Sequence, residues 1–242
     1  MNLIIDVGNT YVKLAVFKKN AFVSKETIEV NHLVKAFKSL LKQYKSIDRA
    51  IISSVGKLDE VTLNYIKDSV DVIELNSKTK FPFKNEYKTP KTLGVDRITL
   101  VSASVNEYSK KNVLIIDAGS CITFDFINNK NQYLGGAISP GIRMRYKSLH
   151  NLTANLPLLD TETPNTIIGN TTNNSIHSGV IHGVLKEIDG VIADYKEKYS
   201  DLTVILTGGD TNFLSKQLKS SIFANSNFLL EGLNFILQFN SD

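Results

Sequence analysis

The chain has 242 residues, of which 42% are hydrophobic and 21% are charged. This length and apolar content suffice for one large core or two modest ones, and they exclude an intrinsically disordered chain. The net charge of +4 is mild and the lysines are spread along the sequence, which argues against the concentrated basic surface of a nucleic-acid-binding protein.

The first half of the chain is predicted to open with three strands and to continue with alternating helices and strands. Alternating apolar residues indicate strands, and apolar residues at spacings of three and four indicate helices. In chain order, the predicted elements are a strand within 3–10, strands at 12–17 and 21–28, a helix at 33–44, a strand at 49–55, a helix at 58–66, a strand at 70–75 and a helix at 95–108.

The second half begins with an echo of the first, because LIIDVGNT at residues 3–10 recurs as LIIDAGSC at 114–121. Strands are again expected after it, and the elements that follow are strands at 122–127 and 133–138, a helix at 176–199, a strand at 202–206 and helical segments to the C-terminus. Two chance strand–turn segments are the alternative explanation. Two halves that each open on three strands instead predict two related domains, which we place at 1–110 and 111–242.

The turn Asp6-Val7-Gly8-Asn9-Thr10 ends the first predicted strand. Glycine permits a tight hairpin whose backbone N–H groups approach phosphate oxygens. Asp6 is placed to hold Mg²⁺ through water, and Lys13 is placed to reach the same phosphates. An ordinary Asx turn is the alternative. The second copy, Asp117-Ala118-Gly119-Ser120, favours a polyphosphate site, because two such turns facing each other across a cleft would position two carboxylates around one ligand.

A second constellation, Asp96-Arg97, stands at the start of the predicted helix 95–108. The positive end of a helix favours a carboxylate such as Asp96, and the planar guanidinium of Arg97 suits a carboxylate ligand. A capping aspartate beside a surface arginine is the alternative. Two glycine-rich segments, GGAISPG at 135–141 and TGGD at 207–210, permit close backbone approach to a ligand, or are turns shaped by packing alone.

Together these motifs resemble those of the type III pantothenate kinases. The shared set occurs in the order and approximate spacing of that family over nearly the whole chain, and it comprises DVGNT with Lys13, LGVDR at 93–97, DAGSCIT at 117–123, GGAISPG with Arg143-Met144, the segment 169–179 and TGGD. The resemblance implies an α/β fold of two tandem actin-like (ribonuclease H-like) domains with an ATP cleft between them. It also implies ATP-dependent phosphorylation of pantothenate to 4′-phosphopantothenate, the first step of coenzyme A biosynthesis.

The resemblance further implies roles for individual residues. Asp96 would be the general base, Asp117 would hold a potassium or ammonium ion, and Ser120 would contact the nucleotide, which binds as ATP with Mg²⁺. The phosphate loop would comprise Asp6, Val7, Gly8, Asn9, Thr10, Tyr11, Val12 and Lys13. The pantothenate pocket would comprise Tyr87, Gly94, Val95, Asp96, Arg97 and Thr172.

Two positions depart from the pattern of the family, which usually has threonine at the position of Ser120 and asparagine at the position of Thr171. Serine keeps the hydroxyl group, so we expect altered affinity and retained function. The resemblance also implies a homodimer whose interface contributes to the acceptor pocket.

The expected location is the cytoplasm, with no membrane or nucleic-acid partner. The single cysteine, Cys121, fits a reducing compartment. No segment approaches the roughly 20 apolar residues of a membrane span, and no basic segment of a secretory signal precedes the first strand.

Two rival functions stay open from the sequence. One is another small-molecule or sugar kinase, or a polyphosphate hydrolase, of the same superfamily, since fold does not fix the acceptor. The Asp96-Arg97 pair and the short, insertion-free halves argue against it. The other is a non-catalytic ATP-binding regulator, against which the retention of Asp6, Lys13, Asp96 and Asp117 argues.

Overall fold

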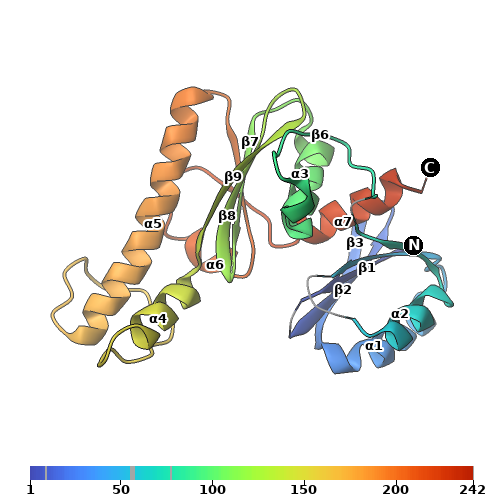
Figure 1. Cartoon of the computed structure of the whole chain (residues 1–242), viewed down its shortest axis with the longest axis horizontal. Coiled ribbons are helices and arrows are strands. Elements are labelled where there is room, and N and C mark those ends of the chain that lie inside the picture. The colour runs from blue at the N-terminus through green and yellow to red at the C-terminus, as the bar shows by residue number, and fades with distance from the viewer. Residues whose placement is uncertain (9, 55–57, 77, 242) are drawn as a thin grey trace. The chain divides into compact units, whose positions relative to one another are not determined.

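The computed structural model describes residues 1–8, 10–54, 58–76 and 78–241 (Figure 1). These residues form two compact α/β units, of which unit 1 comprises Met1–Ser109 with Asn227–Asp242 and unit 2 comprises Lys110–Ser226. The last segment of the chain therefore packs in unit 1, although the sequence reading placed it in the domain 111–242. Its helix is apolar on several sides and buries that surface against unit 1, which no local pattern in the sequence could indicate.

Unit 1 is built on a sheet whose described strands run in the order β3-β2-β1-β4-β5. The strands are β1 (Asn2–Val7), β2 (Tyr11–Lys18), β3 (Ala21–Glu29), β4 (Arg49–Ser54) and β5 (Asp71–Glu74). The first three pair antiparallel, whereas β4 pairs parallel to both β1 and β5. The central strand β1 is buried on both faces, as its uninterrupted run of apolar residues requires.

Helices cover both faces of this sheet. On one face, α1 (Leu33–Gln43) and α2 (Glu60–Lys67) close a core around β1, β2 and β4. On the other face, α7 (Phe228–Phe239) packs against β1, β2 and β4, and α3 (Val95–Tyr108) packs against α7. The remaining short elements of unit 1 are η1 (Val30–His32), η2 (Pro90–Thr92) and β6 (Lys84–Asn85).

The strands of unit 2 run in the order β11-β10-β7-β8-β9. They are β7 (Val113–Ala118), β8 (Cys121–Ile127), β9 (Gln132–Pro140), β10 (Thr203–Thr207) and β11 (Phe223–Ala224). The helices are α4 (Ile142–Asn151), α5 (Thr172–Lys198) and the short α6 (Thr211–Leu214). The long α5 buries one apolar side against the sheet, and the core lies between them.

The two units repeat one topology. In each, an antiparallel meander of three strands comes first, and a later strand pairs parallel to the first strand of the meander. The prediction that each half opens with three strands is therefore confirmed, as is the α/β class. Within the described residues, no helix is long and apolar enough to span a membrane.

Candidate active site

The first Asp-x-Gly turn joins β1 to β2 and places Asp6 beside Lys13. These two residues are cross-strand neighbours, and the Lys13 Nζ lies 3.7 Å from the Asp6 Oδ2. The Gly8 amide donates a hydrogen bond to the Tyr11 carbonyl at 2.9 Å. A Cβ at Gly8 would lie only 3.0 Å from that carbonyl oxygen, so the tight hairpin favours glycine at this position, as predicted.

Asp6 is held in an environment that opposes its charge. Burial raises the pKa of the Asp6 carboxyl above its usual range, the Lys13 ammonium lowers it in part, and the negative charge of Asp96 raises it further. Burial is the largest of these effects. The structure thus brings Asp6 and Asp96, from two separate sequence motifs, within electrostatic range inside unit 1.

The other members of the predicted phosphate loop differ in what they expose. Val7 and Val12 are buried in the core, so their side chains are not available to a ligand. Thr10 and Tyr11 are exposed. Asn9, also predicted to contact the phosphates, lies outside the described residues.

The second predicted constellation forms the first turn of α3. Gly94 is the N-cap of this helix, and the Asp96 Oδ1 accepts a hydrogen bond from the Arg97 amide at 2.9 Å. A Cβ at Gly94 would lie 2.3 Å from the same Asp96 oxygen. The carboxylate therefore folds back over Gly94. Asp96 is not the N-cap residue of α3, but one of its oxygens does bind an amide of the first turn, as the capping alternative expected.

Arg97 is not a surface arginine, since only 5% of it is exposed. Its guanidinium lies over the ring of Tyr87, with 5.6 Å between the guanidinium carbon and the ring centroid. Such stacking favours a charged guanidinium in a partly dry setting. Tyr87 thus lies beside the start of α3 in unit 1, and a pantothenate pocket formed by these residues stays a prediction.

In unit 2, the second Asp-x-Gly turn also joins two antiparallel strands, but it is one residue shorter than the first, because Val7 pairs with Val12 whereas Ala118 pairs with Ile122. The Gly119 amide donates to the Cys121 carbonyl at 2.9 Å, and the Gly141 amide donates to the Ser120 carbonyl at 3.1 Å. A Cβ at Gly141 would lie 2.1 Å from the Gly119 carbonyl oxygen. The last glycine of GGAISPG therefore packs directly on this turn, which leaves Ser120 exposed.

The TGGD segment packs on the same turn from another side. Gly208 has a φ of +96°, and a Cβ there would lie 2.3 Å from the Ala118 carbonyl oxygen and 2.4 Å from the Asp117 Oδ1. The Asp210 amide donates to the Ala118 carbonyl at 2.9 Å. Two glycine motifs that are far apart in sequence thus converge on Asp117.

Asp210 and Arg143 are additions to this site that the sequence reading did not assign. Burial raises the pKa of the Asp210 carboxyl, and the positive charge of Arg143 lowers it in part. Both residues stand in motifs that the chain shares with the family, TGGD and GGAISPG with Arg143-Met144, but the sequence analysis gave neither of them a role. In the described part of the chain, no three His, Cys, Asp or Glu side chains gather as a metal site.

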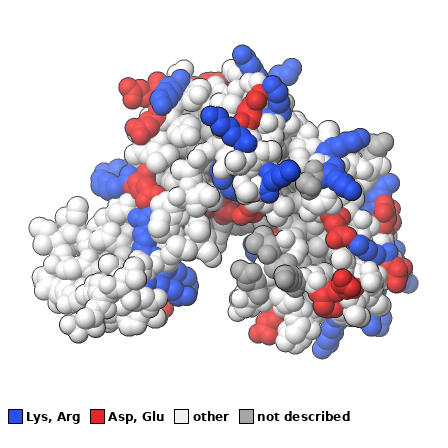
Figure 2. Space-filling model, viewed as in Figure 1, with Lys and Arg blue, Asp and Glu red and all other residues white. Residues whose placement is uncertain are grey.

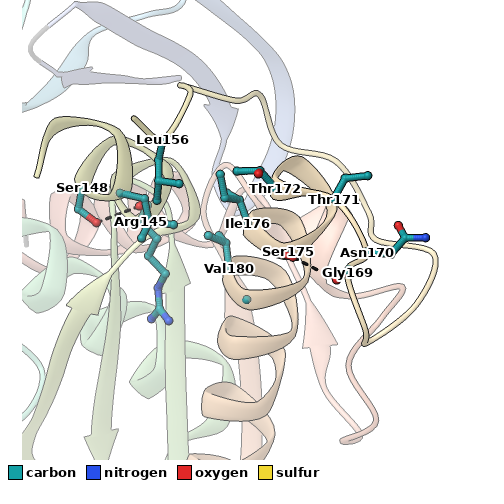
Figure 3. A pocket seen from close by; sticks show the side chains of 12 residues that line it. Arg145, Ser148, Leu156, Gly169, Asn170, Thr171, Thr172, Ser175, Ile176 and Val180 are labelled. Carbon is teal, nitrogen blue, oxygen red and sulfur yellow. Dashed lines mark hydrogen bonds between the residues drawn. The ribbon is translucent and has the colours of Figure 1, made fainter. Parts of the chain in front are cut away.

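Thr172, the predicted pantothenate contact of unit 2, is the first residue of α5 and lines a cavity of about 960 Å³ between α4 and α5. Figure 3 shows Thr172 and Thr171 at the end of α5, above Ile176 and Val180. The Thr171 hydroxyl accepts a hydrogen bond from the Asn174 amide at 3.1 Å and so caps the helix. Asparagine, expected here from the resemblance, is also a good N-cap residue, so the departure at Thr171 preserves the start of α5.

The surface charges are mixed. On the face drawn in Figure 2, lysine and arginine side chains are interspersed with aspartate and glutamate. Among the described residues on this face, positive side chains do not form a single broad basic area of the kind that favours nucleic acid.

Comparison with known proteins gives the same family throughout the chain. The family model for type III pantothenate kinase matches residues 2–194. The type III pantothenate kinase of Christiangramia forsetii is 53% identical over 240 residues, which cover 99% of both chains. That of Flavobacterium johnsoniae is 45% identical over 242 residues and covers 100% of this chain and 99% of its own.

Solved structures with low sequence identity share the fold. A conserved Campylobacter jejuni protein named as a Baf family transcriptional activator is 22% identical, with a TM-score of 0.62 over 99% of this chain and 98% of its own. A ROK family glucokinase from Streptomyces griseus is 10% identical, with a TM-score of 0.54 over 99% of both chains. The fold is therefore the actin-like fold of these kinases, and the full-length relatives identify the chain as a member of the type III pantothenate kinase family.

Proposed function

We propose that this chain transfers the γ-phosphoryl group of ATP to the primary hydroxyl of pantothenate, with Asp96 as the general base. Family membership supports the overall reaction, ATP-dependent phosphorylation of pantothenate to 4′-phosphopantothenate, the first step of coenzyme A biosynthesis. The observation that supports the role of Asp96 is its electrostatic coupling to Asp6 of the phosphate loop. A base must lie close to the transferring phosphoryl group, because the acceptor oxygen attacks it in line.

Asp96 is held in position by its own helix. The Arg97 amide binds the Asp96 Oδ1, which leaves the second carboxylate oxygen to accept the proton of the pantothenate hydroxyl. A carboxylate is a weak base, but the transition state of phosphoryl transfer is loose and the hydroxyl proton leaves late. Asp96 then acts largely by orienting the attacking oxygen.

The phosphate loop provides charge for the polyphosphate. Lys13 offers a point charge to the phosphates, and Asp6 holds the magnesium of MgATP through water. A carboxylate is the hard oxygen ligand that Mg²⁺ prefers, and a divalent cation beside Asp6 favours its ionised form against the burial that opposes it. When bound, Mg²⁺ neutralises the charge that develops on the phosphate oxygens.

Arg97 and Tyr87 form the recognition element for the acceptor. Pantothenate carries a carboxylate, and a planar guanidinium is the side chain best suited to bind a carboxylate through two parallel hydrogen bonds. We also propose Thr172 as a pantothenate contact through its hydroxyl group. We extend the proposal to a nucleotide contact at Ser120, a potassium or ammonium ion at Asp117, a homodimer, a cytoplasmic location and a domain division at residue 110.

The acceptor specificity is tested by coupling ADP release to a spectrophotometric assay with MgATP and either pantothenate or glucose. We expect ADP release with pantothenate as acceptor and none with glucose. Turnover with glucose in place of pantothenate would identify a sugar kinase. ATP binding without ADP release for either acceptor would support the non-catalytic regulator.

The role of Asp96 is tested by the substitution Asp96→Asn. Asparagine keeps an oxygen that accepts from the Arg97 amide, so the first turn of α3 stays intact. Turnover should fall by roughly a hundredfold or more, the usual contribution of a positioned base, while the dissociation constant of ATP stays within a few-fold of the wild-type value.

A matched control is Asp59→Asn, because Asp59 also stands at a helix start of unit 1, where it accepts from the Thr62 amide at 2.8 Å. Asparagine caps as well as aspartate, and this variant should retain full turnover. Near-wild-type turnover of Asp96→Asn would remove Asp96 from the role of base.

A further inference from the structure

Helix α7 returns from the end of the sequence to lie between the two parts of the proposed catalytic site in unit 1. Its apolar residues Leu233, Ile236 and Leu237 pack in one buried cluster with Ile4 of β1 and Ile51 of β4. The same helix packs along α3. Asp6 lies near the end of β1 and Asp96 in the first turn of α3, so α7 packs between the strand and the helix that carry the two carboxylates.

Gly232 of α7 lies directly against α3. A Cβ at this position would lie 2.4 Å from the Thr99 carbonyl oxygen, 3.0 Å from the Thr99 Cγ2 and 3.1 Å from the Ala103 Cβ. The carbonyl oxygen belongs to the helix backbone and cannot rotate aside. Non-bonded heavy atoms rest at about 3.4 Å or more, so a methyl group at Gly232 must part the two helices by about 1 Å.

A shift at Thr99 is carried to the first turn of α3. The Thr99 hydroxyl donates to the Val95 carbonyl at 2.7 Å, and the Ile98 amide donates to the Gly94 carbonyl at 3.2 Å. Asp96 lies between these bonded residues. A backbone displacement at Thr99 therefore moves Asp96 relative to Asp6.

The position of α7 along β1 is fixed by a buried amide. Asn234 is only 3% exposed. Its Oδ1 accepts from the Asn2 Nδ2 at 2.8 Å, and its Nδ2 donates to the Lys19 carbonyl at 2.9 Å. Asn2 begins the strand that ends in Asp6, so this amide ties the helix to the strand that carries the phosphate loop.

We propose that Gly232 and Asn234 of α7 are positioning residues for phosphoryl transfer, which set the distance between Asp96 on α3 and Asp6 on β1. The inference rests on the proposed function, because it takes Asp96 as the base. It assigns α7 a role in turnover beyond its contribution to the core.

The substitution Gly232→Ala tests this role. A displacement of about 1 Å in a catalytic group costs on the order of a hundredfold in rate, so kcat is expected to fall by roughly tenfold to a hundredfold. The dissociation constant of ATP should change less than about threefold, because Asp6 and Lys13 lie on the sheet side of α7 and keep their positions. Gly190→Ala is the matched control, since Gly190 is also a helical glycine but a Cβ there meets no atom within 4 Å.

A purely structural effect is separated from positioning by a double-substitution cycle with Asp96→Asn. If Gly232→Ala acts by moving Asp96, it adds less than about threefold to the loss already caused by Asp96→Asn. If Gly232→Ala only reduced the fraction of folded protein, it would lower kcat by the same factor in the wild type and in the Asp96→Asn variant. Asn234→Ala adds no bulk, removes the anchor to Asn2 and Lys19, and should lower kcat in the same non-additive way if Gly232→Ala fails to fold.

The outcomes of the cycle are distinct. The positioning role is overturned, and the proposed function left intact, if Asp96→Asn loses most of its turnover while Gly232→Ala keeps the wild-type kcat. The same conclusion follows if the losses caused by Gly232→Ala or Asn234→Ala multiply fully with the loss caused by Asp96→Asn. Wild-type kcat in Asp96→Asn overturns the proposed base itself.

Discussion

Replacing Asp6 by asparagine should stabilise the protein at neutral pH while it weakens ATP binding. The attraction between Asp6 and Lys13 at 3.7 Å amounts to about 1 kcal/mol in water and about 4 kcal/mol at an effective dielectric constant of 20. Because the Lys13 side chain is 49% exposed, the lower figure applies. The pKa of Asp6 is nevertheless raised, so the cost of burying its charge exceeds this attraction.

The stabilisation expected for Asp6→Asn is on the order of 1 kcal/mol, a common gain when an unfavourable group is removed from a functional site. It corresponds to a rise of about 2–4 °C in Tm for a chain of this length. Its pH dependence follows from the raised pKa. A carboxyl whose pKa is higher in the folded than in the unfolded protein lowers stability above the folded pKa, and this penalty vanishes as the pH falls toward the unfolded value of 3.8.

Thermal unfolding of both proteins from pH 8 to pH 4 measures this effect. The advantage of Asp6→Asn should be largest at pH 8 and shrink toward pH 4. Asp59→Ala should instead be less stable than the wild type, with the largest difference at pH 8. The hydrogen bond from the Thr62 amide lowers the pKa of Asp59, and the stability that this carboxylate contributes is lost as the pH falls. A lower Tm of Asp6→Asn at pH 8, or a difference between the two proteins that does not change with pH, would refute the reasoning.

Three further predictions concern the two turns. Lys13→Ala should weaken ATP binding about fivefold, as expected for the loss of about 1 kcal/mol of attraction, and titration calorimetry measures this. The substitution of the exposed Lys18 by alanine is the control and should leave ATP affinity unchanged. Equal ATP affinities of Lys13→Ala and the wild type would contradict the role of Lys13. Replacing sodium by potassium at fixed ionic strength should raise turnover, and equal rates would argue against a monovalent cation at Asp117. Gly141→Ala should lower kcat/KM for ATP about tenfold or more by displacing the Gly119 carbonyl, in contrast to Gly190→Ala; unchanged kcat/KM would show that the second turn does not serve the nucleotide.

The elements with a regular apolar pattern were predictable from sequence. The strands of both meanders and the helices α1, α3 and α5 follow from alternation or from spacings of three and four, and the structure confirms them with end shifts of a few residues. Helix α4 was not predicted. Only Ile142 and Tyr146 of this helix are buried, and its other residues are largely charged or polar, so its apolar stripe is too narrow to stand out.

The placement of α7 and the convergence of the glycine motifs depend on contacts between distant parts of the chain. An apolar C-terminal helix can cover any exposed sheet face, so its sequence gives no sign that it packs in unit 1. Gly141 and Gly208 each read as an ordinary turn residue. Their need for glycine becomes clear only where a Cβ would collide with the turn after Asp117, and Arg143 is recognised only by its effect on Asp210.

The repeated octamer therefore predicts the scaffold better than it predicts the chemistry. Both copies form a tight antiparallel hairpin closed by a glycine amide, although the Gly8 amide donates to the carbonyl three residues on and the Gly119 amide to the carbonyl two residues on. Their surroundings differ, because α3 places Asp96 near the first carboxylate, whereas backbone from two glycine segments packs on the second turn. A duplicated strand and turn thus supply two similar frames, and α3 of unit 1 carries Asp96, the residue that we propose as the base. The reaction is accordingly better sought in LGVDR, which has no counterpart in the echo, than in the residues that the two halves share.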